Sequence, residues 1–256
     1  MRKRKAFILA VTAFSLFSVF GQAARAEEET AGGIPAENSM AEEPEMTQTV
    51  TADLYQAGAL GTDDPGISAY SLQTEEMEAQ ICQSLTQVLP ELDVSAWGLT
   101  TAEAGYLKNM FEHVVNGHPE LFYVSNKYSY RYKNSGEILA VVWDYREKDP
   151  GRIASMKAAM EEKISGILTK TDPSMTEVEK LLVLHDALVT GTVYTSATEW
   201  GGGSGCYTAY CALVEGRAVC QGYALAFDLL AERLGIWTEF VASTELDHAW
   251  NLVLLE

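Results

Sequence analysis

The stretch that decides the fold is Gly216-Arg217-Ala218-Val219-Cys220-Gln221-Gly222-Tyr223-Ala224. It leads into a run of small and apolar side chains at helical spacing that ends at Gly235. This spacing predicts that Cys220 lies at the N-terminus of a helix. Unpaired backbone N–H groups and the helix dipole favour negative charge there. We therefore expect the pKa of this thiol to be lowered from about 8.5 towards neutrality.

A second informative stretch is Leu246-Asp247-His248-Ala249-Trp250-Asn251-Leu252-Val253. The pattern predicts a strand over 238–242, a turn, and a second strand that His248 begins. A cysteine at a helix tip and a histidine on a strand are the minimal pair for thiol acyl transfer, because the imidazole takes the thiol proton and later protonates the leaving amine. A single cysteine and a single histidine also occur in proteins that catalyse nothing, so spacing alone leaves both readings open.

The sequence motifs around Cys220 and His248 favour the catalytic interpretation. The string Val219-Cys220-Gln221-Gly222-Tyr223-Ala224, followed by His248-Ala249-Trp250-Asn251, closely resembles the transglutaminase-like superfamily of papain-like thiol enzymes. Residues 184–188, 193–194 and 207–216 also look like the segments that lead into such a core. Residues 118–124 are similar to the region that precedes the core in secreted bacterial members. The resemblance covers roughly residues 72–256 and is strongest from residue 181 onward.

The resemblance implies an α+β fold with a papain-like core. In that core, the helix that bears Cys220 packs on an antiparallel sheet that bears His248, and a helix-plus-β-hairpin region precedes it. Cys220 would attack a carboxamide and form a thioester, which an amine or water then resolves by cross-linking, deamidation or proteolysis. The backbone N–H of Cys220 would be one oxyanion donor. Tyr194 and Trp200 are weak candidates for the second donor.

The family's third catalytic residue is an aspartate that orients the imidazole, on the strand after the histidine strand. The sequence ends at Glu256, before such a strand, so we expect this residue beyond the given sequence and a core that is incomplete without it. Asp247 and Asn251 are poor substitutes for the aspartate. Each lies an odd number of positions from His248, and such residues point to the opposite face of a regular strand.

The N-terminal quarter carries no sign of catalysis. Residues 1–26 read as a secretory signal, with a basic start at Arg2–Lys5, an apolar run over Ala6–Phe20 and a small-residue cleavage pattern at Ala24-Arg25-Ala26. Residues 27–70 are acidic and poor in large apolar side chains, which predicts a disordered linker. We therefore expect a protein that is secreted or associated with the cell surface, with no membrane span after signal removal.

The rest of the chain divides into two predicted regions. Residues 71–171 read as helices and a β-hairpin, with strands over 121–132 and 137–145 separated by Asn134-Ser135-Gly136. Residues 172–256 read as the transglutaminase-like core. A capping box at Thr100 to Glu103 and the pair Asp149-Pro150 mark two helix starts in the first region.

Charge and ligand spacing exclude several classes of function. The formal net charge is −18, which argues against nucleic acid as a partner because nucleic acid demands a basic surface. The four cysteines lack zinc-type spacing, so we expect no metal, and we expect no cofactor. The resemblance implies a protein or peptide substrate, and cell-wall peptide is compatible with it. The other histidines, His113, His118 and His185, read as surface, capping or hydrogen-bonded residues.

Two other functions stay open at this point. The first is a catalytically impaired binding module of the cell surface that keeps the fold, in which Cys220 is an ordinary thiol. The second is a structural disulfide or metal protein that uses Cys206, Cys211, Cys220 and His248. A disulfide or a bound metal at these thiols would distinguish the structural protein from the enzyme. The reactivity of Cys220 towards alkylation would distinguish the binding module from the enzyme.

Overall fold

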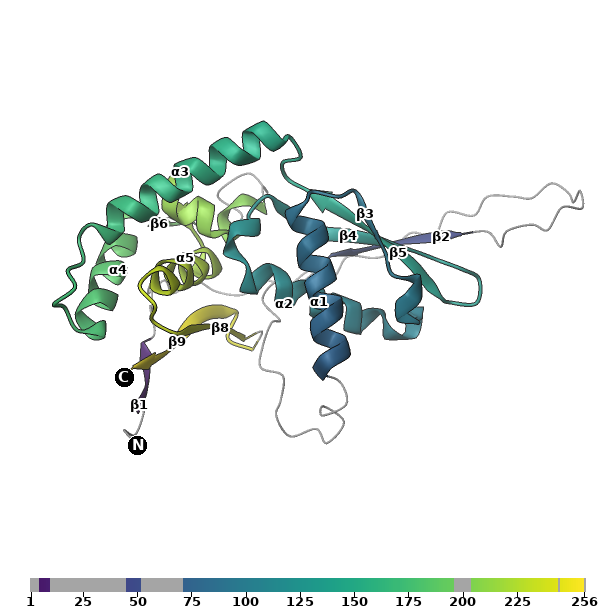
Figure 1. The fold of residues 1–256 in the computed structure, drawn as a ribbon, viewed down its shortest axis with the longest axis horizontal. Coiled ribbons are helices and arrows are strands. Elements are labelled where there is room, and N and C mark those ends of the chain that lie inside the picture. Colours follow the sequence, from purple (N-terminus) through teal and green to yellow (C-terminus); the bar gives the residue numbers. More distant parts are fainter. Residues whose placement is uncertain (1–4, 10–44, 52–70, 196–203, 244, 256) are drawn as a thin grey trace, which may run out of the picture.

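A four-stranded antiparallel sheet and two helices form the first half of the described chain. The computed structural model describes residues 5–9, 45–51, 71–195, 204–243 and 245–255 of an α+β protein (Figure 1). The sheet order is β2-β4-β5-β3. The strands and helices of this half are β2 (Met46–Thr51), α1 (Ser71–Thr86), β3 (Glu91–Asp93), α2 (Ala104–Gly117), β4 (Val124–Tyr132) and β5 (Ile138–Tyr145).

Aromatic side chains fill the space between this sheet and its helices. The ring of Phe111 on α2 lies 5.0 Å from that of Tyr128 and stacks at 5.6 Å on Trp143. The indole N–H of Trp143 donates to the Ser84 hydroxyl at 2.9 Å, so its polar group is satisfied inside the core. The predicted hairpin over β4 and β5 is confirmed, with Tyr130 opposite Val141.

Strand β2 corrects the prediction of an uninterrupted disordered linker over residues 27–70. Residues 46–51 pair antiparallel with β4, with Val50 opposite Tyr128. The Thr49 and Ser129 hydroxyls lie 3.0 Å apart, and the Tyr130 hydroxyl donates to Gln48 at 2.8 Å. Averaged composition hid this short run of threonine and valine, which the open edge of β4 can accept. The rest of the predicted linker, apart from Glu45, lies outside the described residues.

Two long helices lead from the sheet to the second half. Helix α3 (Pro150–Leu168) begins where predicted, and Asp149 caps it by accepting from the backbone N–H of Arg152 at 2.7 Å. Helix α4 (Glu177–Gly191) begins with a capping box between Thr176 and Glu179. A single cluster of buried apolar residues runs from α1 through α3 and α4 to the last strand, so the two halves share one core.

The second half places helix α5 (Cys220–Arg233) between other helices and a small sheet. Figure 1 shows α3 and α4 on one side of α5, with β8 (Thr238–Ser243) and β9 (His248–Leu255) on the other. These two strands form an antiparallel hairpin, with Ala242 opposite Ala249. Before α5 come β6 (Val193–Tyr194), a 3-10 helix (Ser204–Tyr207), a π-helical turn (Cys211–Glu215) and β7 (Arg217–Ala218), which is parallel to β6.

The outer edge of β9 is covered by a segment of the predicted signal. Strand β1 (Lys5–Leu9) pairs antiparallel with β9, with Phe7 opposite Val253. The apolar C-terminal strand therefore has a neighbour on each side in this structure. The other residues of the predicted signal lie outside the described part of the chain. Within the described part, no helix combines the length and apolar character that a membrane crossing requires.

Gly222 allows the first turn of α5 to sit against the segment that precedes it. A Cβ at this position would lie 2.8 Å from the Ala218 Cβ, 2.9 Å from the Cys206 carbonyl oxygen and 3.0 Å from the Thr208 carbonyl oxygen. Two of these three neighbours are backbone atoms, which cannot move aside without shifting the loop.

We predict that Gly222→Ala lowers the free energy of unfolding by about 1–3 kcal/mol, because overpacking against backbone forces a shift. Urea denaturation of the full chain measures the change. Gly166→Ala on α3 is the matched control, since its Cβ would meet nothing within 4 Å. We expect this control to stabilise the protein by about 0.5–1 kcal/mol. Equal effects of the two substitutions would contradict the close packing at Gly222.

Candidate active site

Cys220 is the first residue of α5, which confirms its predicted place at a helix N-terminus. Val219 precedes it in an extended conformation, with φ −87° and ψ 178°, and its N–H donates to the Cys206 carbonyl at 3.0 Å. The Cys220 residue is 6% exposed and packs with Ala224, Ala242 and Ala249. Small side chains thus surround the sulfur, and the helix is held against the start of β9.

The Cys220 sulfur meets the backbone of β9 directly. The N–H of Ala249 and the N–H of Gln221 both form hydrogen bonds with it. Ala249 follows His248, so the hairpin brings the two sequence motifs together in space. Because Ala249 lies opposite Ala242, this contact depends on the register of β8 and β9.

The pKa of the Cys220 thiol is raised, and this corrects the prediction that the helix N-terminus lowers it. Burial is the main cause, and the nearby Asp247 carboxylate raises the pKa further. Hydrogen bonds from the Ala249 and Gln221 N–H groups act in the opposite direction without overcoming the burial. Sequence spacing located the helix tip correctly but carried no information on how deeply the sulfur is buried.

Tyr194 places a hydroxyl group at the same sulfur. Its side chain hydrogen-bonds Cys220, which stabilises the thiolate form of the cysteine. Burial, and after it the charge of the nearby Cys220, raise the pKa of Tyr194 to about 12, so the hydroxyl is a donor at neutral pH. The ring stacks at 6.3 Å on that of Tyr223, whose hydroxyl donates to the Thr192 carbonyl at 2.6 Å. The other weak candidate for an oxyanion donor, Trp200, lies outside the described residues.

His248 begins β9, as predicted, but its imidazole is turned away from the sulfur. Its ring stacks on Trp250 at 6.1 Å, whereas Ala249 faces α5. Side chains two apart on a strand share a face, so His248 and Trp250 lie on the face opposite Ala249. The structure therefore brings the backbone beside His248 to the sulfur, but not the ring.

Asn251 and Asp228 connect β9 to α5 behind the sulfur. The Asn251 amide donates to the Asp228 carboxylate at 2.7 Å and to the Ala224 carbonyl at 3.0 Å. Asn251 thus faces α5 and cannot orient His248, as its odd spacing predicts. Burial raises the pKa of Asp228 to about 6, although hydrogen bonds from Thr238 and Asn251 lower it. Sequence reasoning did not single out Asp228, which only the packed helix and hairpin make unusual.

The remaining histidines and cysteines do not join this site. His113 pairs with Glu78 and His118 with Glu120, each at 2.9 Å, and His185 contacts the neighbouring Asp186. All four cysteines are free thiols, so the structure does not contain the disulfide of the second alternative. Among the described residues, no three histidine, cysteine, aspartate or glutamate side chains gather as metal ligands.

Comparison with known proteins adds no relative: no protein-family model and no curated protein matches this chain.

We predict that protein stability falls as the pH rises through the Asp228 transition. A folded-state pKa of about 6, above the ordinary 3.8, stabilises the fold while the carboxyl is protonated, and this contribution is lost as the pH rises through about 6. In the parent, the free energy of unfolding should fall between pH 4 and pH 7.5 because the buried carboxyl ionises. In Asp228→Asn, this fall should be smaller by on the order of 2 kcal/mol. Denaturation curves at both pH values measure this, with exposed Asp144→Asn as control. An unchanged difference would contradict the burial of the charge.

We predict that Tyr194→Phe moves the pH profile of Cys220 alkylation to more alkaline values, because the thiolate loses a hydrogen-bond donor. The rate with iodoacetamide at pH 7.5 should fall about 2- to 10-fold, as expected for one hydrogen bond. Peptide mass spectrometry on the folded chain follows Cys220 separately from the other cysteines. Tyr132→Phe on β4 should leave the profile unchanged. A faster reaction in Tyr194→Phe would show that the ring only shields the sulfur.

Proposed function

We propose that this protein is a transglutaminase-like thiol enzyme that acts on peptide or glutamine carboxamides through a thioester on Cys220. The observation that carries the proposal is the Cys220 sulfur at the tip of α5, hydrogen-bonded to the N–H of Ala249, the residue after His248. Two motifs that are far apart in the sequence thus meet at one atom that can act as a nucleophile.

In the proposed reaction, the Cys220 sulfur attacks the carboxamide carbon while the His248 imidazole takes the thiol proton. The C–N bond then breaks, and the imidazolium gives its proton to the leaving amine or ammonia. Water or a second amine attacks the resulting thioester, regenerates the thiol and releases an acid or a new amide. The Tyr194 hydroxyl, already at the sulfur, is placed to donate to the oxyanion of each tetrahedral intermediate.

Because the pKa of the Cys220 thiol is raised, we propose that the thiol loses its proton during the attack on the substrate and that no thiolate forms beforehand. A buried neutral thiol is a poor nucleophile, so the reaction needs the base at the moment of bond formation. The ring of His248 has to leave its stack on Trp250 and turn towards the sulfur for this step. The backbone is already in place, so rotation of the side chain is the movement that we propose.

The finer fold assignment belongs to the same proposal. We propose a papain-like core, and the packing of helix α5 on the β8–β9 hairpin supports this proposal. The resemblance also implies a third residue, an aspartate that orients His248. The signal-like start and the acidic composition support a secreted or cell-surface enzyme with a protein or peptide substrate.

One observation favours a non-catalytic binding module instead. The thiol pKa is raised, and the imidazole of His248 stacks on Trp250 away from the sulfur, so the resting site lacks an ion pair. In this alternative, Cys220 helps to pack α5 on β9, and the protein binds a peptide without reacting with it.

We predict that the full chain releases ammonia from a glutamine-containing peptide, or incorporates a fluorescent primary amine into it, at a low rate that Cys220→Ser abolishes. His248→Gln should lower the rate at least about 100-fold, since general base catalysis contributes 10²–10⁴-fold. Ser84→Ala, which changes another buried polar residue in the core, is the control for general destabilisation. Turnover that survives in Cys220→Ser would exclude the thiol mechanism. Binding of the peptide without turnover by the parent would support the binding module.

A further inference from the structure

The side chain next to the nucleophile is anchored to a distant helix. The Gln221 amide donates to the Asn116 side-chain oxygen at 3.1 Å, and the two residues lie 105 positions apart in the sequence. Both are almost fully buried, with 1% of Gln221 and 3% of Asn116 exposed. This hydrogen bond joins the first turn of α5 to the end of α2.

The anchor is a weak source of stability. The Gln221 side-chain oxygen is buried without a hydrogen-bond partner among the described residues. An unsatisfied buried polar atom costs about 1–3 kcal/mol, and two apolar side chains of the same shape could fill the space without that cost. The place of this pair beside Cys220 is therefore of more interest than its contribution to stability.

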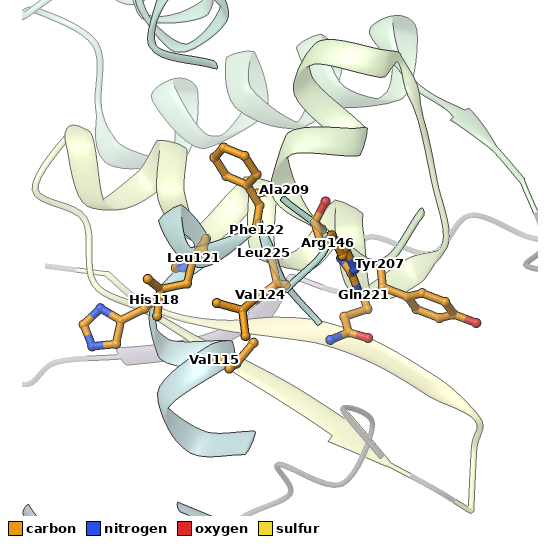
Figure 2. Close-up of a pocket in the computed structure, with 12 residues that line it drawn as sticks. Val115, His118, Leu121, Phe122, Val124, Arg146, Tyr207, Ala209, Gln221 and Leu225 are labelled. Carbon is orange, nitrogen blue, oxygen red and sulfur yellow. The ribbon is translucent and has the colours of Figure 1, made fainter. Parts of the chain in front are cut away.

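The surroundings leave the Gln221 carboxamide little other support. Figure 2 shows Gln221 beside Arg146 and Tyr207 among the residues that line a small cavity. The volume of this cavity is about 20 Å³. That volume holds one water molecule at most. Within the described residues, the hydrogen bond to Asn116 is the one direct protein bond of this carboxamide.

The backbone of the same residue acts on the nucleophile. The Gln221 N–H forms a hydrogen bond with the Cys220 sulfur, and this bond favours the thiolate. A side chain fixed to α2 limits rotation of the Cys220–Gln221 peptide plane, and so keeps its N–H directed at the sulfur. Gly222 follows and is packed against backbone, so the turn has a second fixed point.

We propose that Gln221 is a positioning residue for Cys220, held by its hydrogen bond to Asn116. This inference rests on the proposed function of Cys220 as the nucleophile. Its consequence is that a residue on α2, remote from the substrate, sets the orientation of the peptide group at the attacking sulfur.

The test uses the pH profile of iodoacetamide alkylation of Cys220, read by peptide mass spectrometry on the folded full chain. Gln221→Met and Asn116→Leu keep size but remove the hydrogen bond. Each should move the profile to more alkaline pH and slow the reaction at pH 7.5 about 2- to 10-fold. The double variant should be no slower than the slower single variant, because both changes break the same link. Gln83→Met at an exposed site on α1 is the matched control.

An unchanged profile in folded Gln221→Met would overturn the proposal, and additive effects in the double variant would show that Asn116 is not the anchor. If Asn116→Leu fails to fold, Asn116→Ser removes the anchor without adding bulk and decides the matter. The readout needs no catalysis. If the variants shift the pH profile but the parent shows no turnover, the positioning role of Gln221 stands and the proposed enzyme activity is refuted. If the parent shows turnover but the variants leave the profile unchanged, the enzyme activity stands and the positioning role is refuted.

Discussion

The contact between the Cys220 sulfur and the N–H of Ala249 is the constraint on which the site depends. It requires α5 to begin at the cysteine and the hairpin to keep its register, since a slip by one residue would turn every β9 side chain to the other face. The Asn251 amide fixes that register by bonding Asp228 and the Ala224 carbonyl on α5. The buried hydrogen-bond network and the geometry of the candidate site are thus one feature of the fold.

The resting site favours protection of the thiol over reactivity. Burial keeps the Cys220 thiol protonated. The Tyr194 hydroxyl and the N–H groups of Ala249 and Gln221 lie at the sulfur and stabilise negative charge once it forms. Such an arrangement protects the thiol, because the neutral form resists oxidation and becomes nucleophilic only when a base approaches. His248 stacked on Trp250 is that base at rest in the proposed mechanism.

Sequence reasoning found what depends on local pattern and missed what depends on packing. The start of α5 at Cys220, the cap of α3 at Asp149 and the hairpin of β4 and β5 all follow from spacing and capping chemistry. Strand β2 was missed because it needs the edge of β4, which no local pattern reveals. The direction of the Cys220 pKa and the anchor at Gln221 were missed for the same reason, since burial arises only when distant segments meet.

The most direct measurement of the central claim is the mass of the peptide that contains Cys220 after the full chain is mixed with a glutamine-containing peptide and quenched in acid. A thioester mechanism predicts an adduct on Cys220 with the mass of the peptide less ammonia, which hydroxylamine removes because the bond is a thioester. Such an adduct on Cys82, Cys206 or Cys211 instead, or a Cys220 that stays unmodified while the substrate is consumed, would contradict it.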